Sequence, residues 1–183
     1  MVFSIKKVFR VPGYFLGIYF KIGLKKREGT RVIGVTNKVG NNYVLFLDYD
    51  IDDIMMITDE IRALQKKHRL STAYLFKTRR GFHVIIPDLL TYNELTNILS
   101  QATIEYAYLD VPRNNKKKVW VLRLTDKKDN KIIFYEQLYN ECTRTTSYPH
   151  LRLLMKKKIP VAASQVINSS YDSNELQYAT YEA

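Results

Sequence analysis

Two aspartates directly after a hydrophobic segment are the residues best suited to chemistry. Asp48 and Asp50 follow the apolar run 43–47 in the string YVLFLDYD. Alternate side chains of an extended chain point to the same face, so we expect the two carboxylates to lie close together. Such a pair repels unless a cation lies between its members, and a divalent metal there can bind nucleotide phosphates and polarise an attacking oxygen. In the alternative, Asp50 caps a helix that begins near Ile51 and Asp48 is solvated at the strand end.

A second polar group occupies the segment 78–84, whose sequence is TRRGFHV. Gly81 permits a close backbone approach or an unusual φ at a turn. The guanidinium of Arg80 can pair with a phosphate through two hydrogen bonds. His83 alternates with Val84, and from the opposite face of the strand it can hydrogen-bond a phosphate. The alternative is a hairpin turn with two solvated arginines and a half-buried histidine.

The charge balance points to a polyanionic partner. The chain has 29 lysines and arginines against 18 aspartates and glutamates, a net charge of +11. Nucleic acid is the first expectation for such an excess. Basic runs at 25–27, 116–118 and 156–158 are compatible with a template groove. A charged accessory protein of the ribosome would show the same excess.

Cysteine usage and hydropathy limit which metals the chain is expected to bind and where in the cell the protein is expected. Cys142 is the only cysteine, which excludes an intramolecular disulfide and a cysteine-cluster zinc site. Carboxylates must then supply most metal ligands, which favours Mg²⁺ or Mn²⁺. No segment reaches the roughly 18 to 20 apolar residues that span a bilayer. Residues 1–10 also lack the apolar core of a signal peptide. We therefore expect a cytoplasmic protein without a membrane partner.

Hydrophobic periodicity predicts an α+β protein in which helices pack on a mainly antiparallel sheet. A polar tail from Ser169 to the end is expected to be mobile, which leaves one domain at 1–168 and a flexible segment at 169–183. Pro87 is expected to close the fifth strand. The predicted strands are 14–22, 31–36, 43–48, 72–77, 82–86 and 104–110, with a hairpin of 118–125 and 131–135, and the predicted helices are 51–70 and 91–102.

A strand ending in D-x-D, a helix, and a strand pair carrying T-R-R-G-F-H resemble the archaeo-eukaryotic primase superfamily. The first motif of that family is an apolar strand ending in D-x-D or D-x-E, and its second is often S-G-R-G-x-H. Its third motif is an apolar residue followed by aspartate, for which Leu109-Asp110 is the best match and Asp126 a rival. The resemblance covers about 43–124, the part that would carry the motifs.

The resemblance implies an RRM-like catalytic core that acts as a metal-dependent primase or primase-polymerase. Asp48, Asp50 and Asp110 would hold two Mg²⁺ or Mn²⁺ ions, and Arg80 with His83 would hold the triphosphate of the incoming nucleotide. A basic residue after the third motif would assist them, with Arg123 as first candidate and Lys118 as second. The partners would be a single-stranded DNA template, nucleoside triphosphates and a helicase or polymerase. The short chain is similar to minimal versions from archaeal viruses and plasmids, which act inside the host cell.

Three features depart from the family pattern. Arg79 stands where members often have glycine, and Thr78 replaces the usual serine. The cysteines of a zinc-binding stem are also missing. An alternative function therefore stays open, in which the chain is an inactive primase-derived or RRM-like protein that binds single-stranded nucleic acid in replication. A metal-dependent nuclease would use the same acids without an evident need for Arg80 and His83.

Overall fold

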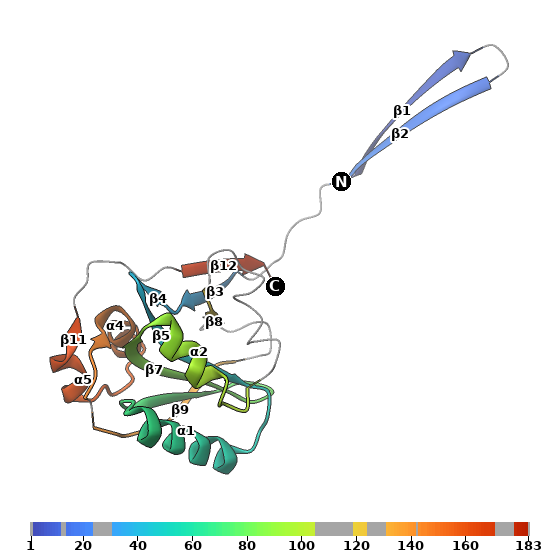
Figure 1. Ribbon diagram of the computed structural model, residues 1–183. Coiled ribbons are helices and arrows are strands. Elements are labelled where there is room, and N and C mark those ends of the chain that lie inside the picture. Colours follow the sequence, from blue (N-terminus) through green and yellow to red (C-terminus); the bar gives the residue numbers. More distant parts are fainter. Residues whose placement is uncertain are drawn as a thin grey trace.

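The fold is known from a computed structural model, which describes residues 2–11, 14–23, 31–104, 119–123, 131–141, 143–170 and 178–182 (Figure 1). It is an α+β protein, as the sequence predicts. A seven-stranded sheet carries the candidate functional residues. Its strands are β4 (Lys38–Val39), β5 (Asn42–Tyr49), β6 (Ala73–Lys77), β7 (Phe82–Leu90), β9 (Ile133–Leu138), β10 (Thr146–Ser147) and β11 (Ser169–Ser170).

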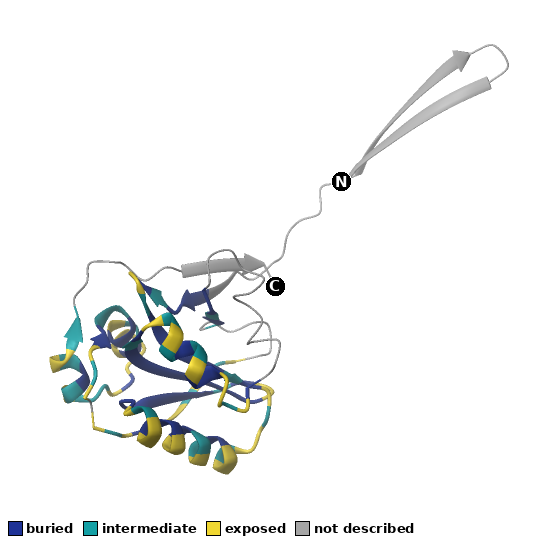
Figure 2. Cartoon of the chain, in the orientation of Figure 1, coloured by how far each residue is buried: buried dark blue, intermediate teal, exposed yellow. Residues whose placement is uncertain are grey.

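Antiparallel pairing dominates this sheet. The order β4-β5-β7-β6-β9 is antiparallel throughout, while β10 joins β7 at Asp88 and the short strand β11 runs parallel to β10. The central strands β5 and β7 are buried along most of their length (Figure 2). Burial on both faces explains why these two strands read as nearly continuous apolar runs.

A smaller sheet joins the main one through Asn37. In this sheet β3 (Arg31–Thr36) lies between β8 (Val121–Arg123) and β12 (Tyr178–Glu182). The Asn37 side chain accepts a hydrogen bond from Trp120 N at 3.0 Å and donates one to Val44 O at 3.2 Å. Its backbone pairs with the same two residues. Two further strands, β1 (Val2–Val11) and β2 (Tyr14–Gly23), pair with each other in an antiparallel hairpin.

Helices cover both faces of the main sheet. On one face, α1 (Ile54–His68) contacts β5 through a Tyr49–Glu60 hydrogen bond, and α2 (Tyr92–Leu99) packs the ring of Tyr92 against that of Tyr43. On the other face lie α4 (Tyr148–Lys156) and α5 (Ala163–Ile167). The ring of His150 on α4 lies 5.7 Å from that of Phe46, between centroids.

The helix boundaries differ from the sequence predictions because capping side chains set them. Asp53 caps α1 by accepting a hydrogen bond from Met56 N at 3.1 Å. The alternative that Asp50 caps this helix is therefore wrong. Thr91 and Glu94 form a capping box that starts α2, and this helix ends at Leu99 rather than at 102.

Several strand predictions are also corrected. Pro87 does not close its strand, because β7 continues to Leu90 through an irregularity in the β5–β7 register, where a proline is tolerated. The predicted hairpin of 118–125 with 131–135 is not seen in the described part of the chain, where β8 pairs with β3 and β9 with β6. The described residues of the segment 169–183 include the short strands β11 and β12, and the division into a domain and a mobile tail stays a prediction. The strand predicted at 104–110 lies almost wholly outside the described residues.

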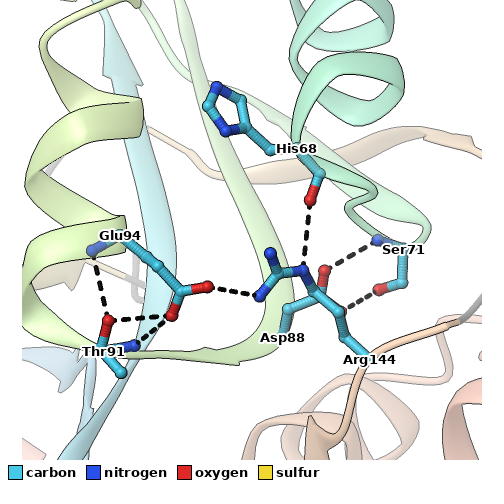
Figure 3. Close-up of polar contacts among 6 residues, drawn as sticks. All are labelled: His68, Ser71, Asp88, Thr91, Glu94 and Arg144. Atoms are coloured by element: carbon cyan, nitrogen blue, oxygen red, sulfur yellow. Dashed lines mark hydrogen bonds and ion pairs between the residues drawn. The ribbon is translucent and has the colours of Figure 1, made fainter.

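A polar network fixes the end of β7 that is remote from His83 (Figure 3). Asp88 accepts hydrogen bonds from the backbone and hydroxyl of Ser71, at 2.8 and 2.5 Å. Arg144 donates to His68 O at 3.2 Å and to Glu94 Oε1 at 3.0 Å, which ties the end of α1 to the start of α2. Burial raises the pKa of Asp88, and the hydrogen bonds from Ser71 and the nearby Arg144 oppose that rise.

His150 makes the unfolding free energy depend on pH. Its Nε2 lies 3.0 Å from Thr36 O, an acceptor, so Nε2 carries the proton and Nδ1 accepts from Ser147 Oγ at 2.7 Å. Complete burial lowers the pKa of His150 from 6.5 to about 4, against the opposing hydrogen bond to Thr36. The unfolded chain therefore binds the extra proton first as the pH falls.

We expect the unfolding free energy to drop by about 3 kcal/mol between pH 6.5 and pH 4 because of this histidine. Denaturant unfolding across that range measures the effect. His150→Asn keeps a donor for Thr36 O but cannot titrate, so its pH profile should lack this component. Identical pH profiles for the two proteins would refute the assignment to His150.

Candidate active site

The β5–β7 ladder brings Asp48 and His83 together. The two residues are direct Cα partners, so their side chains lie on the same face of the sheet. Asp48 Oδ1 and His83 Nε2 are 3.3 Å apart. The His83 side chain is only 8% exposed, whereas that of Asp48 is 40% exposed. The pair therefore lies where the buried strands meet solvent.

The second ring nitrogen of His83 is buried and has no hydrogen-bond partner among the described residues. A buried polar atom of this kind usually has a partner, so an unpaired one needs an explanation. Nε2 lies 3.3 Å from Asp48 Oδ1, and this contact orients the ring. A ring with a proton on each nitrogen would offer Nδ1–H to an anion.

Gly81 holds the turn between β6 and β7 against the end of β5. A Cβ at this position would lie 1.9 Å from Tyr49 O and 2.8 Å from Ile51 O. Thr78 closes the turn, because its hydroxyl accepts from Gly81 N at 3.1 Å and its backbone N–H donates to Gly81 O at 2.9 Å. Gly81 does not have a positive φ. Glycine is therefore required here by the close approach of the backbone of Tyr49 and Ile51, and not by the backbone conformation. This contact fixes the backbone between Asp48 and Asp50 relative to His83.

Asp50 and Arg80 lie at the same end of the sheet, and both are exposed. Asp50 follows the last residue of β5, and Arg80 belongs to the turn that Gly81 closes. The alternation of a strand does not extend to Asp50, because β5 ends at Tyr49. That Asp50 shares a face with Asp48 stays a prediction.

Of the remaining predicted residues, only Arg123 is described, and no contact joins it to this pair. Arg123 lies on β8 opposite Gly34, in the smaller sheet, and its buried Nη1 has no hydrogen-bond partner among the described residues. Asp110 and Lys118 lie outside the described residues, as does the rival Asp126. The predicted third carboxylate is therefore not tested.

Sequence reasoning missed residues that support the end of β5 from beneath. The Tyr49 hydroxyl donates to Glu60 Oε1 at 2.8 Å, and Thr103 N donates to the same oxygen at 2.9 Å. Burial, with the adjacent Glu60 carboxylate, raises the pKa of Tyr49 far above its usual value. Tyr49 therefore stays neutral and anchors the strand to α1. Its place between two aspartates in an apolar strand was the available signal.

The donor set at the Asp48 end fits a hard divalent cation. Asp48 and Asp50 offer carboxylate oxygens that water can reach, which suits Mg²⁺ or Mn²⁺ rather than a thiolate-bound metal. The described residues contain no group of three or more histidine, cysteine, aspartate or glutamate side chains that could hold a metal ion. Water can fill the coordination positions that the two carboxylates leave.

In the part of the chain that the structure describes, each helix is too short or too polar to span a bilayer. Comparisons with protein-family models, with curated proteins and with solved structures found no match.

Proposed function

We propose that this chain is a metal-dependent nucleotidyltransferase of primase or primase-polymerase type. It would join nucleotides on a single-stranded template during replication or repair. The observation that carries the proposal is the contact between Asp48 and His83, with the second nitrogen of the imidazole left for a ligand. The order of the two sequence motifs and the net charge of +11 support it. The antiparallel order β4-β5-β7-β6-β9 also supports an RRM-like core.

Each residue has a defined role in this reaction. His83 donates a hydrogen bond to a phosphate oxygen of the incoming nucleoside triphosphate, and Asp48 orients its ring. Arg80, exposed at the turn, pairs with the same triphosphate. Asp48 and Asp50 hold Mg²⁺ or Mn²⁺, which when bound lowers the pKa of the primer 3′-hydroxyl and stabilises the leaving pyrophosphate.

The bonds that change are those of phosphoryl transfer. The 3′-oxygen of the growing strand bonds to the α-phosphorus of the triphosphate. The bond from that phosphorus to the β-phosphate oxygen breaks, pyrophosphate leaves, and the hydroxyl proton passes to water. This chain contributes the positioning of the triphosphate and a carboxylate site that balances its charge.

A labelled-nucleotide extension assay on a single-stranded template tests the proposal. We expect incorporation that requires the template and a divalent cation, and that EDTA abolishes. Both Mg²⁺ and Mn²⁺, ribo- and deoxyribonucleotides, and primed and unprimed templates should be supplied. Absence of nucleotide incorporation under all these conditions would refute the proposed nucleotidyltransferase activity.

The alternative function is binding of single-stranded nucleic acid without catalysis. The excess of basic residues favours it, because electrostatic contact with phosphates needs no metal. Binding that persists in EDTA, in a protein that incorporates no nucleotide, would identify this function.

A further inference from the structure

The segment that contains α4 and α5 has an unusual charge pattern. Residues 143–170 include five lysines and arginines and no aspartate or glutamate. Arg144 is committed to an ion pair with Glu94. The other four are exposed on α4 and on the turn that follows it: Arg152, Lys156, Lys157 and Lys158, here called the α4 basic surface.

This surface belongs to the layer that covers the Asp48 face of the sheet. His150 of α4 packs on Phe46, and Phe46 and Asp48 are two residues apart on β5, so they share a face. The separation along the strand is roughly 7 Å. Tyr74, opposite Ile85, contacts Gln165 of α5 on the same side. The helices α1 and α2 cover the other face.

Backbone conformation adds a second observation. Among the described residues other than glycine, only Lys158 and Arg69 have positive φ, at 60° and 52°. Lys158 ends α4 in a Schellman motif, in which its N–H bonds to Met155 O at 2.8 Å and Ile159 N bonds to Leu154 O at 3.1 Å. Glycine is favoured at this position because a Cβ strains the left-handed conformation. Arg69 has the same conformation, so the strain does not by itself mark a ligand site, but it makes the two residues a matched pair for substitution.

We propose that the α4 basic surface binds the sugar-phosphate backbone of the single-stranded template and leads it over this helix layer toward Asp48, which is partly exposed near the end of β5. This inference rests on the proposed function. Arg152 and Lys156 lie one helical turn apart, and the lysine run continues the positive charge beyond the helix end. A row of cations without an intervening carboxylate matches the regular anions of a nucleic-acid strand.

The basic end of α1 provides a matched control. Lys66, Lys67 and Arg69 also crowd a helix C-terminus, and Arg69 has the same left-handed conformation. Favourable interaction with the helix dipole would explain both clusters equally well. Only the α4 cluster, however, lies in the layer over the Asp48 face. Comparing variants of the two clusters therefore distinguishes nucleic-acid contact from stabilisation by the helix dipole.

The test is fluorescence anisotropy of a labelled oligo(dT) strand with the full-length protein in EDTA, as a function of salt. One variant carries Arg152→Gln, Lys156→Gln and Lys158→Gln, and the control carries Lys66→Gln, Lys67→Gln and Arg69→Gln. For three lost phosphate contacts we expect the slope of log K against log salt to fall by about 2, and Kd at low salt to rise at least about 10-fold. The control should stay within about twofold of wild type.

A single substitution gives a test that does not weaken the fold. Lys158→Gly and Arg69→Gly both relieve a strained residue, so both should raise the midpoint of thermal unfolding. Only Lys158→Gly should weaken oligo(dT) binding, by about 3- to 5-fold, with a salt slope lower by about 0.7.

Wild-type binding by the α4 triple variant, or equal losses in the two triple variants, would overturn the inference. So would equal competition by polyglutamate, which would indicate an acidic protein as the partner. Binding is measured without metal or nucleotide, so a chain that binds as expected and incorporates nothing refutes only the proposed enzyme. If the wild-type protein extends a strand but the α4 triple variant binds oligo(dT) as tightly as wild type, only the proposed role of the α4 basic surface is refuted.

Discussion

Asp48→Ala combined with Asp50→Ala is expected to abolish template-directed nucleotide incorporation, with a loss of at least about 10³-fold. A factor of that size corresponds to about 4 kcal/mol of transition-state stabilisation, within what a metal site supplies. Asp50 is exposed, so its loss should change stability little. The loss of Asp48 should cost about 1 to 3 kcal/mol of unfolding free energy, because it removes the carboxylate beside the buried His83 ring. The labelled-nucleotide extension assay measures the first effect, and thermal unfolding measures the second.

A matched control removes two exposed acids elsewhere. Asp59 and Glu141 are exposed and lie on α1 and after β9. Asp59→Ala with Glu141→Ala changes the net charge by the same amount and should incorporate nucleotide at the wild-type rate. Full activity in the Asp48/Asp50 variant would show that these carboxylates do not support catalysis.

Gly81→Ala is expected to cost about 3 kcal/mol of unfolding free energy, at the upper end for overpacking. The new Cβ would lie 1.9 Å from Tyr49 O, and because both Tyr49 O and Ile51 O are backbone atoms, no side chain can rotate away. The turn and the end of β5 must separate, which moves Asp48 and Asp50 relative to His83. Urea unfolding measures the loss, and incorporation should fall with it.

The adjacent residue separates stability from chemistry. Arg80 is exposed, so Arg80→Ala should change stability by no more than about 0.5 kcal/mol. Nucleotide incorporation by Arg80→Ala should still fall, because the guanidinium that pairs with the triphosphate is lost. An unchanged unfolding midpoint in Gly81→Ala would mean that the close approach to Tyr49 is not required.

The elements around the first two motifs were predictable from the sequence because their periodicity is strong. The apolar run before Asp48 became β5, and the three- and four-residue spacing of Ile57, Ile61 and Leu64 became the buried side of α1. The exact start of α1 was not predictable. Three aspartates lie near it, at 50, 52 and 53, and any of them can cap a helix.

Elements held by distant contacts were missed. The helix α4 has Pro149 in its first turn, where proline is tolerated but suggests a break, and its apolar spacing covers only two turns. Its position depends on His150 meeting Phe46 and Thr36, far away in sequence. Pro87 lies in β7 because the partner strand is irregular there, and the sequence of β7 alone does not carry that information.

The pairing of Asp48 with His83 was only partly predictable from the sequence. Alternation predicted that His83 would face away from Val84, and the family resemblance placed it near the aspartates. The register that makes the two residues direct partners is set by the whole β5–β7 ladder and by Gly81, which no local pattern reveals.

The central claim is that a divalent cation binds at Asp48 beside His83. Paramagnetic Mn²⁺ broadens nuclear resonances with the inverse sixth power of distance, and the chain has only three histidines. In a titration of histidine-labelled protein, we predict that the His83 ring signals broaden first, ahead of those of His68 and His150, and that Asp48→Asn removes this order. Broadening of His68 before His83, or an unchanged order in Asp48→Asn, would contradict the claim.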